Sequence, residues 1–205
     1  MSETTYSVDR DLKEAAAMAS GLETYVRGTN LYGSVGGGLF SSNMPSLTIG
    51  ALLMRLRRLR AQFDSLTPDQ RSRLEQAEAA HEKARREWTH HYTEKLTQEG
   101  FSRLKAMNTF FEECGERALD RPNPCASIYL PEALRRTIVQ EILIAMHDSN
   151  LPTDALSAEA RKIDGRLRRY TAPSDFIWAA ELEAIYPRSP YWWLYAKPPV
   201  TVKQG

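Results

Sequence analysis

The chain has 205 residues, with 27 basic and 26 acidic side chains and a formal net charge of +1. This length fits one domain with its own core and argues against two full domains. The charge balance removes the whole-surface attraction that marks a strongly basic nucleic-acid binder, and a 42% hydrophobic fraction excludes a wholly disordered chain.

The N-terminal part is predicted to be a helix followed by a loop. Apolar residues recur at helical spacing over 8–27, between a capping Ser7 and Gly28. A glycine-rich loop is expected at 28–45. Its segment 33–38 lacks the preceding strand and the lysine of phosphate-binding loops, so we interpret it as a connector, with a recognition loop as the alternative.

The next two helices are expected to fold back on each other. The first opens at Pro45 and Ser46, and the second at the Thr67-Pro68 pair, a capping residue followed by proline at the first helical position. Leucines of one helix would face alanines of the other, which permits close packing. We therefore expect an antiparallel helical hairpin over about 46–99 that could project and pair like a coiled coil.

The helical pattern from Pro68 runs to about Leu119, which is too long for a compact domain. At 1.5 Å per residue it would span about 78 Å, whereas a domain of this size is about 45 Å across. We expect this helix to project or to break, most readily at Gly100.

Three more helices are expected at 131–148, 153–170 and 174–186, and prolines then favour an extended tail over 187–205. The predicted fold class is all-α: a helical bundle forming a single domain over 1–205. The tail either packs across this body or anchors a partner, since Trp and Tyr dominate interface hot spots. The residues predicted to bind a partner are Tyr191, Trp192, Trp193 and Tyr195.

A basic cluster in the first helix of the hairpin is a candidate site for nucleic acid or another anion. Alternatively, its side chains pair with Glu75, Glu78 and Glu82 on the neighbouring helix. A smaller basic cluster lies at 166–169. The first cluster comprises Arg55, Arg57, Arg58 and Arg60.

Two E-x-x-H pairs have the spacing at which a carboxylate and an imidazole share a metal ion. Both pairs lie on one helix, about 13 Å apart along its axis, so they cannot form one dinuclear centre within one chain. A solvated helix with incidental histidines is the alternative. The candidate ligands are Glu78, His81, Glu87, His90 and His91.

No nucleophile and base stand in a catalytic pattern, so the sequence predicts no catalytic residue and no cofactor. Cys114 and Cys125 do not have a metal or redox spacing, and we expect Cys114 to be a buried hydrophobic residue. With no long apolar run and no secretory signal, we expect a cytoplasmic protein without a membrane span.

These features favour a non-enzymatic interaction, scaffold or adaptor protein whose partner is another protein or a second copy of this chain. Two alternatives stay open. One is a nucleic-acid-associated regulatory module that uses the basic helix 55–60. The other is a helical metal-dependent enzyme that uses the E-x-x-H pairs of helix 68–99.

Overall fold

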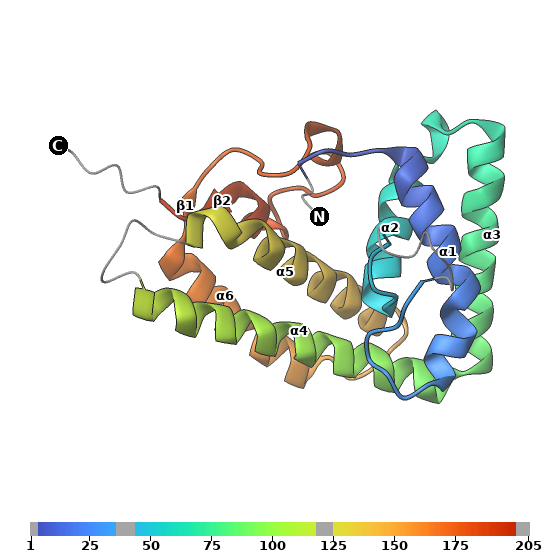
Figure 1. The fold of residues 1–205 in the computed structure, drawn as a ribbon, viewed down its shortest axis with the longest axis horizontal. Coiled ribbons are helices and arrows are strands. Elements are labelled where there is room, and N and C mark those ends of the chain that lie inside the picture. Colours follow the sequence, from blue (N-terminus) through green and yellow to red (C-terminus); the bar gives the residue numbers. More distant parts are fainter. Residues whose placement is uncertain (1–3, 36–43, 118–124, 200–205) are drawn as a thin grey trace.

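The computed structural model describes residues 4–35, 44–117 and 125–199, without the side chains of 115–117 and 125–127. In these ranges the chain forms six α-helices and two short strands, so the all-α prediction is confirmed. The helices lie in two groups (Figure 1). One comprises α1 (Val8–Arg27), α2 (Ile49–Ala61) and α3 (Pro68–Glu87), and the other α4 (Thr89–Arg117), α5 (Cys125–Asp148) and α6 (Asp154–Tyr170). None of the helices in the described ranges is long and apolar enough to cross a bilayer.

Local capping signals set both ends of α1 and the start of α3 where the sequence predicts them. The Ser7 hydroxyl accepts a hydrogen bond from the backbone N–H of Arg10 at 3.4 Å, and Gly28 caps the other end of α1 directly after Arg27. At the start of α3, the Thr67 and Gln70 side chains bond each other's backbone N–H groups in a capping box.

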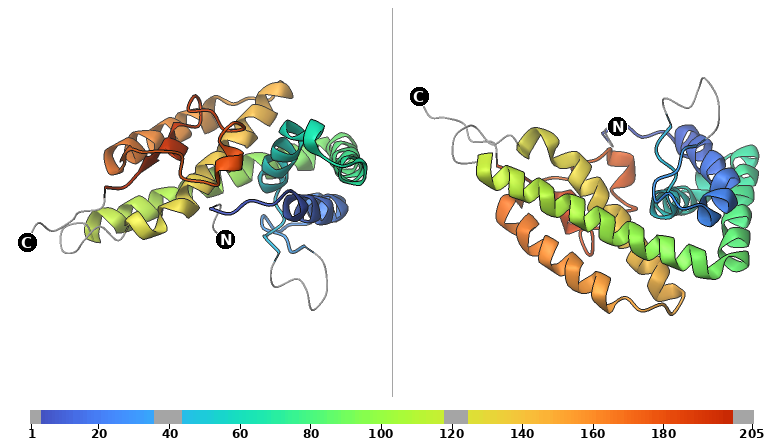
Figure 2. Two further views of the ribbon diagram at one scale, coloured as in Figure 1. Left: turned by 90° about the horizontal axis from the view of Figure 1, so that it is seen from above. Right: turned by 60° about the horizontal axis from the view of Figure 1, so that its bottom comes forward.

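The packing of α2 and α3 differs from that of a hairpin standing alone. The two helices run in opposite directions, as expected, but α3 packs mainly on α1, while α2 packs on α5 and α1. Figure 2 (left) shows α1, α2 and α3 nearly end-on as one three-helix group. The apolar face of α2 is therefore covered from two sides, which a two-helix pairing would not do.

The long helical stretch breaks at Trp88, and the predicted break at Gly100 is wrong. The Trp88 backbone leaves the helical conformation (φ −121°, ψ 36°), and α4 sets off at a steep angle to α3 (Figure 1). Gly100 lies inside α4, where a Cβ atom would come within 2.8 Å of the Leu156 side chain on α6. The glycine therefore serves close packing of two helices. Further along α4, Cys114 is buried as predicted, but it is disulfide-bonded and not a thiol.

The C-terminal third is less helical than predicted. Helix α6 matches the expected 153–170 closely, and α5 begins earlier than expected, with Pro131 inside it. Residues 174–186 do not form the predicted α-helix. They contain one 3-10 turn, Ala180–Leu182, and the backbone N–H of Ile177 donates to the backbone O of Leu194 at 2.9 Å.

A two-residue ladder closes this region. Strand β1 (Ala172–Pro173) pairs antiparallel with β2 (Ala196–Lys197), directly after the 3-10 helix η4 (Trp192–Tyr195). The partners of β1 and of Ile177 lie about twenty residues away in sequence. Apolar spacing within 174–186 could not reveal them, because it reports only contacts along one helix.

The aromatic tail packs across α5. The Tyr191 hydroxyl donates to Glu141 Oε1 at 2.7 Å, and the indole Nε1 of Trp193 donates to Thr137 Oγ1 at 2.9 Å. The Tyr129 hydroxyl donates to the backbone O of Trp193 at 2.9 Å. The buried polar tips of Tyr191 and Trp193 thus have partners on α5, and this segment is part of the core.

Candidate functional site

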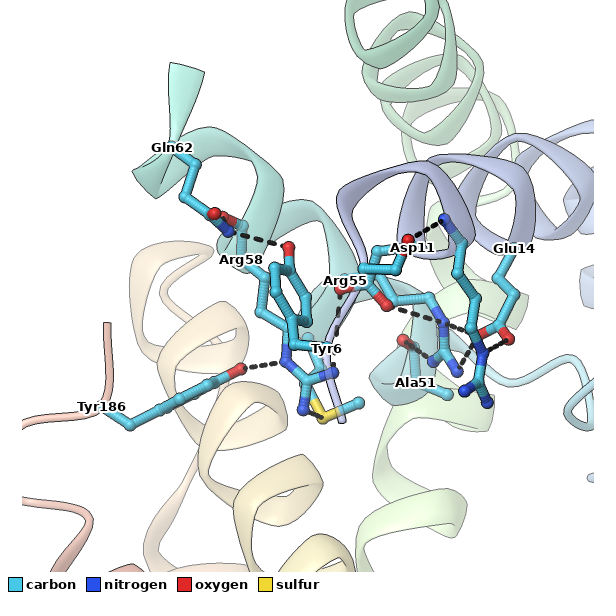
Figure 3. A network of polar contacts seen from close by, with 11 residues as sticks. Tyr6, Asp11, Glu14, Ala51, Arg55, Arg58, Gln62 and Tyr186 are labelled. Atoms are coloured by element: carbon cyan, nitrogen blue, oxygen red, sulfur yellow. Dashed lines mark hydrogen bonds and ion pairs between the residues drawn. The ribbon is translucent and has the colours of Figure 1, made fainter. Parts of the chain in front are cut away.

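The basic cluster of α2 is folded into the protein. Arg55 Nε donates to Glu14 Oε2 at 2.7 Å, and the Arg58 guanidinium lies 3.7 Å from the Asp11 carboxylate (Figure 3). Arg58 Nε also donates to the Tyr186 hydroxyl at 3.0 Å. Arg55 and Arg58 are both buried. These two guanidiniums therefore hold α1, α2 and the C-terminal segment together.

The two outer arginines of this cluster are also paired within the chain. Arg57 Nε lies 3.7 Å from Glu141 Oε1, and Arg60 forms an ion pair with Glu78. Of the three glutamates expected as partners, Glu82 pairs with Arg85 instead. All four arginines of the predicted anion site thus have acidic partners, which favours the paired interpretation over the nucleic-acid one.

The five candidate metal ligands are not brought together. The described residues contain no group of three or more His, Cys, Asp and Glu side chains able to hold a metal ion. His81 Nε2 is instead hydrogen-bonded to the Tyr92 hydroxyl at 2.8 Å, and burial lowers the pKa of His81 to about 4. Of the others, Glu78 pairs with Arg60, and His91 meets the Trp88 ring edge-to-face at 5.9 Å.

The glycine loop is described only in part. The backbone N–H groups of Gly33 and Leu47 each donate to the other's backbone O, at 2.9 and 2.8 Å. A Cβ on Gly33 would come within 2.8 Å of the Tyr25 ring. This first glycine serves a close backbone approach, and residues 36–38 of the loop lie outside the described ranges.

A groove of about 370 Å³ lies between the end of α6 and the aromatic tail. The last turn of α6 and β1 form one wall, and η4 and β2 the other. A groove of this volume is within the usual range for ligand sites. Its lining residues are Arg168, Thr171, Ala172, Pro173, Arg188, Trp192, Tyr195 and Ala196.

Two arginines of this groove lie over aromatic rings. The Arg168 guanidinium carbon is 3.9 Å from the centre of the Trp192 ring, and that of Arg188 is 4.6 Å from the Tyr195 ring. A stacked guanidinium keeps the N–H groups at its edge, where a carboxylate can bind two of them at once. Within the described part of the chain, neither arginine has a carboxylate partner, unlike the four on α2.

The sequence-predicted aromatic residues divide between core and groove. Tyr191 and Trp193 are at most 1% exposed and belong to the core, and Trp192 is half-buried and lines the groove. Tyr195 does both, because it is 8% exposed and also lines the groove. Of the two arginines, Arg168 belongs to the noted 166–169 cluster. Arg188 was missed, because it stands alone between two prolines in sequence and acquires its surroundings only through the fold.

No protein-family model matches this chain, and comparisons with curated proteins and with solved structures find no match. The class of protein has to be inferred from the fold and the groove themselves.

Proposed function

We propose that this chain is a non-enzymatic protein–protein interaction module, and that the groove at the end of α6 binds an acidic segment of its partner. The observation that carries the proposal is the pair Arg168 and Arg188. Both lie on ring faces at the groove, and neither has a carboxylate partner among the described residues. Two guanidiniums without an ion-pair partner among the described residues lie on one groove and complement a negatively charged ligand.

The composition of the groove supports a peptide ligand. Arginine, tryptophan and tyrosine are the residue types that dominate protein interfaces, because they combine large contact area with directional hydrogen bonding. Here Trp192 and Tyr195 supply the apolar floor, and the guanidinium edges supply donors for Asp or Glu carboxylates. The aromatic tail thus contributes both to the core and to the proposed binding surface.

Fluorescence anisotropy with a labelled hexaglutamate peptide at low salt tests the proposal. Arg168→Gln and Arg188→Gln should each weaken binding, and the double variant should weaken it at least tenfold, because each removes charge-assisted hydrogen bonds worth about 1.5–3 kcal/mol. Arg169→Gln is the matched control, since Arg169 is an exposed neighbour outside the groove.

A second readout locates the bound peptide. The indole N–H resonance of Trp192 should shift on titration, whereas that of the buried Trp193 should shift much less. Equal losses of peptide affinity in Arg168→Gln and Arg169→Gln would contradict the proposed site. An unchanged indole N–H resonance of Trp192 would contradict it as well.

A further inference from the structure

A second pocket, of about 310 Å³, adjoins the groove and shares Arg188 and Tyr195 with it. The segment 175–183, which was expected to be helical, forms most of its wall. Its lining combines aromatic rings with carboxylates, a composition opposite in charge to that of the groove. The lining residues are Asp175, Phe176, Trp178, Ala180, Glu183, Arg188 and Tyr195.

Three aromatic rings wall this pocket at differing angles. The Phe176 ring centre lies 5.2 Å from that of Tyr195, with the planes tilted by 53°, and 6.5 Å from that of Trp178, edge-to-face at 74°. Trp178 Nε1 is fully buried, so the positive N–H edge of the indole is turned away from solvent. Of the three rings, Trp178 and Tyr195 are buried and Phe176 is only partly buried, so Phe176 is the ring most open to a ligand, and the π-face of such a ring attracts cations.

Rings of this pocket already accept cations from the same chain. The Arg58 guanidinium carbon lies 5.0 Å from the Trp178 ring centre, and Arg188 lies over Tyr195. The Phe176 ring has no cation over it among the described residues. A ligand cation entering the pocket would therefore add to an existing pattern of cation–π contacts.

Two carboxylates make the pocket acidic. Asp175 and Glu183 are exposed at its rim, and within the described residues neither forms an ion pair. Glu183 acts on the Tyr195 side of the pocket: burial and then the Glu183 charge raise the pKa of the Tyr195 hydroxyl, and Arg188 opposes them. Among the lining residues the two carboxylates outnumber the one guanidinium, that of Arg188, because Arg58 lies outside the lining and is paired with Asp11. The pocket lining therefore carries a net negative charge.

We propose that this pocket binds an alkylammonium group, the side chain of a lysine in the same partner segment. This inference rests on the proposed function, since it extends the acidic segment to one in which an acidic residue neighbours a lysine. Arg188 then lies between the groove and the pocket. The bound acidic residue is on its groove side, and the carboxylates and rings of the pocket are on its other side. Unmodified and trimethylated lysine share this chemistry, and two probes distinguish them.

Nuclear magnetic resonance titration of the full chain with n-butylammonium and with n-butyltrimethylammonium tests this pocket without any peptide. Both cations should shift ring resonances of Phe176 and Trp178 with saturation, whereas neutral n-butanol should not. Tighter binding of the trimethyl probe assigns the pocket to methylated lysine, and tighter binding of the primary ammonium assigns it to unmodified lysine. Saturation by butanol equal to that by the cations would overturn the proposal.

Matched variants separate this proposal from the proposed function. Asp175→Asn with Glu183→Gln should weaken cation binding at least tenfold, whereas Glu181→Gln, an exposed neighbour outside the pocket, should not. Arg168→Gln should weaken binding of the acidic peptide and leave n-butylammonium binding intact. If the cations bind but the acidic peptide does not, the proposed groove is wrong and the pocket stands. If the acidic peptide binds but the cations do not, the proposed pocket is wrong and the groove stands.

Discussion

Arg58 Nε donates a hydrogen bond to the Tyr186 hydroxyl at 3.0 Å, which joins α2 to a residue 128 positions further along the chain. The same guanidinium lies 3.7 Å from the Asp11 carboxylate on α1. Burial raises the pKa of Tyr186, so the phenol stays neutral and serves as an acceptor for the buried cation. One arginine thus fixes three distant parts of the sequence relative to one another.

Removing the phenol oxygen tests the weight of this contact. Tyr186→Phe should lower the free energy of unfolding by about 1–3 kcal/mol, because Arg58 Nε would be left buried without that acceptor. Urea denaturation at pH 7 measures the change. Tyr32→Phe is the control, since Tyr32 is 46% exposed and should lose less than about 0.5 kcal/mol. Equal stability of the wild-type and Tyr186→Phe proteins would show that the bond contributes nothing.

The two adjacent tryptophans of the tail should differ sharply in their effect on stability. Trp193 is 1% exposed and hydrogen-bonded to Thr137 on α5, so Trp193→Ala should lower the free energy of unfolding by about 3–5 kcal/mol. Trp192 is half-buried, so Trp192→Ala should cost much less while weakening binding of the acidic peptide. Thermal denaturation and the anisotropy assay measure the two effects. Similar stability losses would contradict the division of the tail into core and groove.

Two helical glycines should respond in opposite directions to an added methyl group. A Cβ at Gly50 would lie 2.6 Å from Ile138 Cγ2 and 2.8 Å from Ile142 Cδ1, so Gly50→Ala should destabilise the protein by about 1–3 kcal/mol. At Gly165 the nearest atom would be 4.0 Å away, so Gly165→Ala should stabilise α6 by about 0.5–1 kcal/mol. Denaturation midpoints test both, and a stabilised Gly50→Ala protein would refute the close approach of α2 and α5.

His81 should make the folded state sensitive to acid. Its pKa is about 4 when folded and about 6.5 when unfolded, so the unfolded chain binds a proton first as the pH falls. The contribution of neutral His81 to the free energy of unfolding is complete above pH 6.5. It is lost as the pH falls towards 4, by about 3 kcal/mol in all.

Glu132 acts in the opposite direction over an overlapping range and must be separated from His81. Burial raises the pKa of Glu132 to about 7. The contribution of its protonated carboxyl to the free energy of unfolding is therefore complete below pH 4.5 and is lost as the pH rises through 7. The test is therefore the difference in unfolding free energy between the wild-type and His81→Gln proteins at pH 7 and pH 4.5. Parallel pH curves for the two proteins would contradict the role of His81.

The sequence predicts those helix ends that local groups determine. Ser7 and Gly28 bound α1 through backbone contacts within a few residues, and the capping box of α3 depends on Thr67 and Gln70 alone. The break at Trp88 was missed because glycine is the residue that local propensity marks as weak. Gly100 is instead required by the approach of Leu156 from another helix, which no local pattern contains.

The candidate site was predictable only in part. Aromatic content identified Trp192 and Tyr195, and charge clustering included Arg168. The surroundings of Arg188 depend on β1 meeting β2 and on the irregular path of residues 174–186, which the apolar spacing predicted to be a helix. Charge clustering also marked Arg55 and Arg58 as candidates for an anion site. It could not show that they are paired, because their partners Glu14 and Asp11 come from a helix distant in sequence.

The position of Tyr186 near the end of the described chain has a consequence for folding during translation. Synthesis proceeds from the N-terminus, so α1 and α2 emerge from the ribosome well before the phenol that Arg58 requires. Until the segment through Tyr195 has been made, the face of α5 that receives Tyr191 and Trp193 is uncovered. The core around α5 therefore closes only after Tyr191 and Trp193 have been synthesised.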